Sequence, residues 1–151
     1  MVPRKKRTPV VVDTNVLVRS FKARSAANWN RRVISLWLIE RKLQLIVSEE
    51  LIDEYLEIFS DVVGLDSETL HEWRLRFEHD RRSTLCGLGR RYTESRDPDD
   101  NVLLATATTG RASYLITNDR DLLELPEEFQ YTLPYDIVTP QTFLRLWELD
   151  R

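Results

Sequence analysis

Acidic residues recur where the sequence pattern predicts that a buried strand ends or a helix begins. The run VVVDTNVLV, residues 10–18, reaches Asp13 after three β-branched residues that are typical of a strand buried in a parallel sheet. Asp119 lies two residues past a second such run, YLIT, and Asp100 lies near the start of a helical pattern. Because ligands bind beyond the carboxyl ends of parallel strands, we expect these three carboxylates to point into one crevice.

Glu54 is a fourth candidate, since it lies among apolar positions in the second turn of the helix expected after strand 43–47. Each acid alone could simply cap a helix or a turn. Four carboxylates that lie close together repel one another unless cations sit between them. Sites made only of oxygen ligands select Mg²⁺ or Mn²⁺. A metal-bound water can be deprotonated to attack a phosphate, so the convergence of the four acids predicts a metal-dependent phosphoryl chemistry.

Strand patterns alternate with helix patterns along the whole chain. This alternation predicts an α/β fold, a three-layer α/β/α sandwich with a mainly parallel central sheet. We expect a single domain over residues 1–151, with a basic N-terminal tail at 1–8. The predicted strands are 10–12, 43–47, 92–95, 114–117 and 135–138, and the predicted helices are 25–42, 49–59, 66–82, 98–109 and 140–149.

Composition limits the classes of protein that remain. The chain has 151 residues, 42% hydrophobic and 31% charged, and its net charge of −3 argues against a nucleic-acid binder held by charge alone. One cysteine, Cys86, excludes an intrachain disulfide and suggests a cytoplasmic protein. No apolar run is long enough to span a membrane and no signal peptide is visible. The only histidines, His71 and His79, lie on a predicted helix away from the acidic segments.

Four segments together resemble the PIN domain nuclease family. They are VVVDTNVLV (10–18), SEELIDEYLEIF (48–59), DPDDNVLLATATTGRASYLITNDRDLLEL (97–125) and YDIVTPQTFL (135–144). The resemblance covers residues 9–147. The form in which DPDDN is followed by LITNDRDLL is similar to the VapC-like subgroup, the toxins of toxin–antitoxin pairs.

The resemblance implies an endoribonuclease that depends on Mg²⁺ or Mn²⁺ and hydrolyses RNA phosphodiester bonds with a metal-activated water. Residue by residue, the four metal-site acids of the family match Asp13, Glu54, Asp100 and Asp119. Asp13, Asp100 and Asp119 would hold metal, and Glu54 would bind metal or position the water. No acid of the set is missing, which favours an active enzyme.

Further residues around these acids match polar positions of the family. Asn15 and Thr117 match positions that line the site. Asp97 is the second choice for the role of Asp100, because both lie on roughly the same helical face if the helix starts early. Asp121 could support a second metal ion or merely cap a short helix around Leu122.

The resemblance also suggests partners. Two basic segments, 74–91 and 4–7, would supply phosphate contacts beside the acidic site, and Arg81 and Arg82 are the candidates for RNA binding. A toxin of this subgroup has a cognate antitoxin protein. Exposed apolar helix faces would suit an antitoxin groove or a homodimer, although the core is expected to take most of the four tryptophans.

Two other readings of the sequence remain open. A PIN-like scaffold could bind RNA or protein without catalysis, although the intact acids argue against it. Phosphatases and response-regulator receivers also place an aspartate after a first parallel strand. The phosphatases need a second aspartate where this chain has Asn15, and receivers need a lysine after a late strand, whereas the last lysine here is Lys42.

Overall fold

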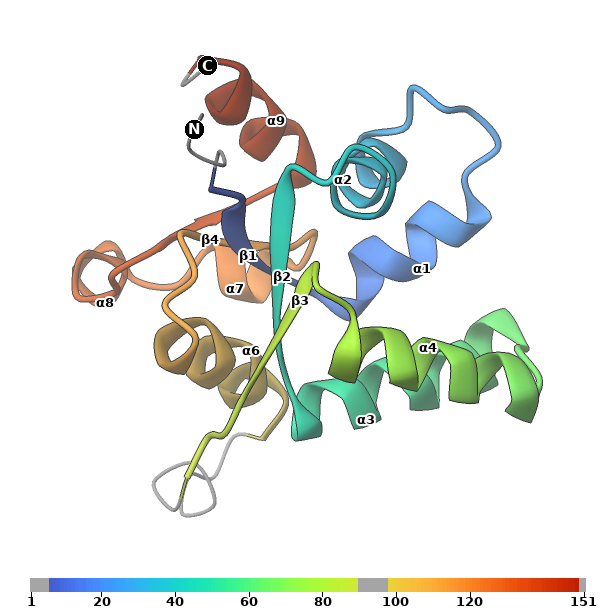
Figure 1. Cartoon of the computed structure of the whole chain (residues 1–151). Coiled ribbons are helices and arrows are strands. Elements are labelled where there is room, and N and C mark those ends of the chain that lie inside the picture. Colours follow the sequence, from blue (N-terminus) through green and yellow to red (C-terminus); the bar gives the residue numbers. More distant parts are fainter. Residues whose placement is uncertain (1–5, 90–97, 150–151) are drawn as a thin grey trace, which may run out of the picture.

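A five-stranded, fully parallel sheet forms the centre of the molecule (Figure 1). The computed structural model describes residues 6–89 and 98–149, of which residues 98–101 are described by their backbone alone. The strands lie side by side in the order β3-β2-β1-β4-β5, and every neighbouring pair is parallel. They are β1 (Thr8–Val12), β2 (Leu43–Ser48), β3 (Ser83–Cys86), β4 (Tyr114–Ile116) and β5 (Asp136–Val138).

Helices alternate with these strands, which confirms the predicted three-layer α/β/α class. The helices are α1 (Thr14–Lys22), α2 (Trp29–Leu38), α3 (Glu49–Ile58) with the π-helical turn η1 (Phe59–Val63), α4 (Ser67–His79), α6 (Pro98–Thr109), α7 (Arg120–Leu123), α8 (Glu127–Tyr131) and α9 (Pro140–Leu149). Among the described residues, no helix is long and apolar enough to cross a membrane.

The chain crosses the sheet in two directions. From β1 it moves outward to β2 and β3, then returns to β4 beside β1 and continues to β5. Because parallel crossovers are right-handed, connections that run in opposite directions cover opposite faces of the sheet. Accordingly α2 packs against α9, whereas α6 packs against β1, β2 and β4 (Figure 1). The strand order therefore reverses between β1 and β4, the type of position at which open α/β sheets bind ligands.

The position of α6 follows from two contacts with β2. The Thr106 hydroxyl lies 2.8 Å from that of Ser48, the last residue of β2, and both residues are fully buried. Gly110, just past the helix, approaches β2 so closely that an added Cβ would lie 2.0 Å from Cγ2 of Ile46. Thr106 lies level with Ser48 at the carboxyl end of β2, and Gly110 lies level with Ile46, nearer the amino end. The helix therefore runs back along β2, and its first turn lies beyond the carboxyl edge of the sheet.

Most predicted elements are present. The strands expected at 10–12, 43–47, 114–117 and 135–138 correspond to β1, β2, β4 and β5, and four of the five predicted helices correspond to α3, α4, α6 and α9. The strand expected at 92–95 lies outside the described residues. The predicted helix 25–42 is shorter, because the Asn28 side chain caps α2 by accepting from the backbone N–H of Asn30 (2.9 Å).

Three elements were not predicted: α1, β3 and α8. Residues 16–18 are apolar like those of β1, yet they belong to α1, in which the buried Leu17 lies one helical turn before Phe21. The β3 segment STLC has no alternating pattern, since its residues are exposed or half-buried at the edge of the sheet. Short elements at an edge take their structure from the neighbouring strand rather than from their own sequence.

Candidate active site

Asp13 and Asp119 meet at the point where the strand order reverses. Val12 and Ile116 are paired residues of β1 and β4, and the Asp13 backbone N–H donates to the Ile116 carbonyl at 2.9 Å. Asp119 follows β4 and caps α7, its Oδ1 accepting from the Asp121 backbone N–H at 3.0 Å. The two carboxylates therefore lie together at the carboxyl ends of adjacent strands, where the sequence predicted them.

Thr117 and Asn15 hold the Asp13 carboxylate in place. The Thr117 hydroxyl donates to Oδ2 of Asp13 at 2.7 Å, and the Asn15 side-chain amide donates to the same oxygen at 3.2 Å. The Thr117 oxygen also accepts from the Asp119 backbone N–H at 2.9 Å. Thr117 is fully buried and so connects the two acids directly.

No basic side chain within residues 6–89 and 102–149 forms an ion pair with either acid. Burial raises the pKa of Asp13, the negative charge of Asp119 raises it further, and the Thr117 hydrogen bond acts in the opposite direction. Neither acid takes part in any ion pair formed between residues that the structure describes. Two neighbouring carboxylates that have no cationic partner among the described residues are a donor set that a hard divalent cation fits.

Tyr55 connects α3 to this site, and sequence reasoning placed it only among the apolar residues of that helix. Its side chain is fully buried, and its hydroxyl donates to the carbonyl of Val12, the residue before Asp13. Burial raises the pKa of Tyr55 well above its ordinary value, and the charges of Asp13 and Glu54 raise it further. The sequence could have indicated this role, because Tyr55 lies in the apolar stripe of its helix and a buried phenol hydroxyl needs a hydrogen-bond partner.

Glu54 is half-buried on α3, whereas its neighbours Asp53 and Glu57 are exposed, as the sequence indicated. Its negative charge raises the pKa of the adjacent Tyr55, whose hydroxyl contacts the end of β1. Within the described part of the chain, however, no three acidic, histidine or cysteine side chains gather closely enough to hold a metal ion. Among the described residues, Asp13 and Asp119 therefore form a pair of acids and not a complete metal site.

Asp100 and Asp97 are the predicted sources of the missing ligand. The backbone of Asp100 lies in the first turn of α6, which begins beyond the carboxyl edge of the sheet. Its side chain lies outside the described residues, and so does the whole of Asp97.

A chain of asparagine side chains extends from Asp13 to α2, and sequence reasoning did not find it. Oδ1 of Asn15 accepts from both the backbone and the side-chain N–H groups of Asn118, at 3.3 Å each. The Asn118 amide also donates to Oδ1 of Asn30 at 2.8 Å, and the Asn30 amide donates to Asn28 at 3.2 Å. The only signal in the sequence was the position of Asn118 between Thr117 and Asp119.

Three other candidates lie elsewhere. Asp121 is exposed on α7, and Asp119, not Asp121, caps that helix. Arg81 and Arg82 directly precede β3, so they lie at the amino edge of the sheet. The expectation that these two arginines lie beside the acidic site was wrong. It did not include strand β3, whose parallel pairing with β2 places the residues before it at the amino edge, whereas the acids lie at the carboxyl edge.

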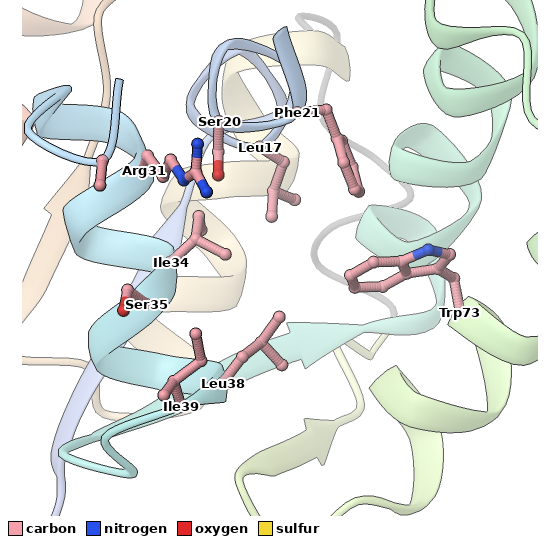
Figure 2. A pocket seen from close by; sticks show the side chains of 10 residues that line it. Leu17, Ser20, Phe21, Arg31, Ile34, Ser35, Leu38, Ile39 and Trp73 are labelled. Carbon is pink, nitrogen blue, oxygen red and sulfur yellow. The ribbon is translucent and has the colours of Figure 1, made fainter. Parts of the chain in front are cut away.

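An apolar pocket of about 370 Å³ opens between α1, α2 and α4 (Figure 2). Figure 2 shows Leu17 and Phe21 on one side, Ile34 and Ile39 on another, and Trp73 opposite them. Phe21 and Ile39 remain 40% and 76% exposed. Of the four tryptophans, Trp37 is buried as expected, whereas Trp73 contributes to the wall of this pocket.

Comparisons with known proteins agree with this architecture. Among solved structures, VapBC2 from Rickettsia felis bound to a DNA fragment from their promoter matches with a TM-score of 0.53 and 12% identity, over 87% of this chain and 98% of that chain. FitAB bound to the IR36 DNA fragment matches with a TM-score of 0.50 and 12% identity, over 87% and 94%. At such identity these matches show the fold alone. No curated protein matches the chain significantly.

The family is shown by the sequence itself. The sequence profile of the PIN domain matches residues 9–121, which include β1 with Asp13, α3 with Glu54, and the segment from α6 to Asp119. This match extends over well more than half of the chain, and the doubly wound parallel sheet agrees with it. The chain belongs to the PIN domain family of nucleases.

Proposed function

We propose that this protein is a divalent-metal-dependent ribonuclease and the toxin of a toxin–antitoxin pair. The observation that carries the proposal is the Asp13–Asp119 pair at the reversal of strand order. The Thr117 hydroxyl donates to the Asp13 carboxylate and accepts from the Asp119 backbone N–H, and neither acid has an ion pair with a described residue. Membership of the PIN domain family supports nuclease activity. The choice of RNA over DNA rests on the resemblance to the toxin subgroup.

In this proposal Asp13 and Asp119 are metal ligands, and Asp100 and Glu54 complete the set. A bound Mg²⁺ or Mn²⁺ supplies a water of lowered pKa and neutralises charge on the phosphate. Thr117 and Asn15 fix the Asp13 carboxylate by donating to Oδ2, so they would orient it toward a bound cation. Such supporting hydrogen bonds commonly determine metal affinity, because they orient the ligands.

Tyr55 has a positioning role. By donating to the Val12 carbonyl it holds α3, which carries Glu54, against the end of the strand that presents Asp13. The hydrogen-bonded asparagines Asn15, Asn118 and Asn30 likewise hold α2 near the residues that follow β1 and β4. Both supports are partly or fully buried, so the carboxylates are placed by the fold and not by the metal alone.

We further propose that the pocket between α1, α2 and α4 receives an apolar segment of the antitoxin. Its mainly apolar lining and the exposed Phe21 and Ile39 leave hydrophobic surface that a partner could cover. Arg31 lines the pocket as well, so an acidic residue on the partner would find a charge opposite it. The similarity in fold to VapBC2 and FitAB supports this choice of partner.

The proposal is tested by incubating the purified protein with labelled single-stranded RNA and with DNA of the same sequence, in Mg²⁺, in Mn²⁺ and in chelator. The expected result is cleavage of RNA that requires metal. Replacement of Asp13 by Asn is expected to lower the rate more than about 100-fold, since loss of a ligand exceeds the effect of losing a supporting residue. Asp136→Asn, the same change at an exposed residue of β5, is the control.

The outcomes distinguish the alternatives. RNA that is bound but cut under none of these conditions would favour a non-catalytic RNA-binding module. Cleavage of DNA alone would contradict the assignment of RNA as substrate. Cleavage that persists in chelator would contradict metal dependence.

A further inference from the structure

Four arginines surround a second, polar pocket of about 240 Å³ at the amino edge of the sheet, away from the acidic pair. Its walls are Arg7, Arg41, Asp80, Arg81 and Arg82. These residues immediately precede β1, β2 and β3, so they gather where the three strands begin. Four guanidinium groups and one carboxylate give this pocket a charge of +3 (four minus one) in a chain whose net charge is −3.

The single carboxylate is already engaged. Nε and Nη2 of Arg82 donate to the two oxygens of Asp80 at 2.7 and 2.6 Å, and this pair holds the pKa of Asp80 at about 2. The Arg82 carbonyl accepts from the backbone N–H of Leu45 (2.7 Å) and from the indole N–H of Trp37 (2.9 Å). The segment 80–82 is therefore hydrogen-bonded to β2 and α2, and among the arginines of the pocket Asp80 forms its ion pair with Arg82.

Arg7 is held in place by neutral groups. Its Nε donates to the Arg41 carbonyl at 3.3 Å, and its Nη1 donates to the Arg81 carbonyl at 3.0 Å and to the Gln44 side chain at 3.1 Å. These acceptors fix the guanidinium without cancelling its charge. The Gln44 amide donates to the same Arg81 carbonyl at 3.0 Å, which fixes the opposite wall.

Arg41 and Arg81 complete the cationic lining. Both are exposed, and neither forms an ion pair with any residue of the described ranges. Three guanidinium groups without an acidic partner thus face one cavity, and their mutual repulsion would be relieved by an anion. The planar guanidinium fork matches phosphate oxygens. The volume is below the roughly 300 Å³ typical of drug-sized ligand sites, which suits a single small anionic group.

We propose that this pocket binds a phosphate group. The group is either a backbone phosphate of an RNA strand that also reaches the acidic site or a free phosphate, and both offer the same oxygens to the arginines. The first source rests on the proposed nuclease function and the second does not. Six residue steps along an extended strand, from Arg7 to Asp13, separate the two sites by roughly 20 Å, so the pocket is distinct from the catalytic site.

Phosphate binding is measured first, by isothermal titration calorimetry of the full chain with inorganic phosphate. The double variant Arg41→Gln, Arg81→Gln removes two exposed charges that make no described ion pair. We expect it to bind phosphate at least about tenfold more weakly than the wild type, since each arginine supplies charge-assisted hydrogen bonds. The control Arg19→Gln, Arg145→Gln removes the same charge from exposed residues of α1 and α9 and is expected to bind as the wild type does. No heat with millimolar phosphate, or equal binding by both double variants, would overturn the proposal.

The second arm identifies the source of the phosphate. Binding of a single-stranded RNA oligonucleotide is measured in chelator over a range of salt. Loss of the one backbone phosphate held in the pocket lowers the slope of log K against log salt by about 0.7. A lower slope in the Arg41/Arg81 variant assigns the pocket to RNA, and an unchanged slope with phosphate binding lost assigns it to free phosphate. RNA cleavage without phosphate binding would leave the nuclease proposal intact and reject this one.

Discussion

Asp13 shows how much of the site depends on single residues. Its carboxylate ends a fully buried stretch of β1, accepts from two side chains and lies next to the charge of Asp119. The sequence indicated Asp13 and Asp119 because both follow predicted strands of a parallel sheet, whose carboxyl ends share one edge. The sequence did not indicate Tyr55 or Asn118, whose hydrogen bonds connect segments that are remote along the chain.

Tyr55→Phe tests the support beneath Asp13. The change leaves the buried Val12 carbonyl without its side-chain donor, so we expect the free energy of unfolding to fall by about 1–3 kcal/mol. Urea denaturation measures the difference. Tyr131→Phe, at a residue that is 86% exposed, serves as the control and is expected to change little. Equal effects of the two substitutions would show that the Tyr55 hydroxyl supports nothing.

Asp80→Asn tests the ion pair in the arginine-lined pocket. Arg82 holds the pKa of Asp80 at about 2, below its ordinary value of 3.8, so the carboxylate stabilises the folded state above about pH 4 and this contribution is lost as the pH falls toward 2. Solvent reaches the pair, so we expect a loss of about 1 kcal/mol or less near pH 6. The difference from wild type in urea unfolding should disappear near pH 2. A difference independent of pH would contradict this explanation.

At the scale of elements, the contact between α6 and β2 determines where the first turn of α6, which contains Asp100, lies relative to the sheet. Predictions succeeded for strands with buried β-branched runs and for helices with clear caps, such as Ser48 before α3, whose hydroxyl accepts from the Leu51 N–H at 3.2 Å. They failed where packing rather than local pattern decides. The apolar residues 16–18 form part of a helix instead of continuing the strand, and the polar edge segment 83–86 pairs with β2.

Gly110→Ala tests the close approach of α6 to β2. A Cβ at this position would lie 2.0 Å from Cγ2 of Ile46 and 3.1 Å from the Thr106 carbonyl oxygen, so the helix end must shift. We expect a loss of about 1–3 kcal/mol in the free energy of unfolding, as is typical of overpacking. Gly87→Ala, where no atom lies within 4 Å of the added Cβ, is the control. Equal stability of the two variants would show that α6 can move at no cost.

At the scale of the whole molecule, the order β3-β2-β1-β4-β5 creates the site by bringing the ends of β1 and β4 together across about 100 residues of sequence. The alternation of strands and helices predicted the parallel sheet and hence a shared edge for the acids. The sequence could not predict the amino-edge pocket, because it requires the pairing of the unrecognised strand β3. The same topology leaves the apolar pocket between α1, α2 and α4 at the surface.

Ile39→Asp tests the proposed partner surface. Ile39 is 76% exposed, so we expect the variant to keep its stability within about 0.5 kcal/mol and to keep its nuclease activity. Its complex with the proposed antitoxin should weaken, because an aspartate in an apolar contact is desolvated without a partner. Calorimetry of the complex measures this, with Tyr131→Asp on α8 as the control. An unchanged affinity for the Ile39 variant would exclude this pocket as the docking site.

The central claim is that Asp13 and Asp119 hold a divalent cation, and thermal unfolding with and without Mn²⁺ tests it most directly. Without metal, Asp13→Asn should be at least as stable as the wild type, because burial and the Asp119 charge disfavour the carboxylate. Mn²⁺ at 100 times its dissociation constant should stabilise the wild type and Asp136→Asn by about 2.7 kcal/mol and leave Asp13→Asn unchanged. Equal stabilisation of all three proteins would contradict the claim.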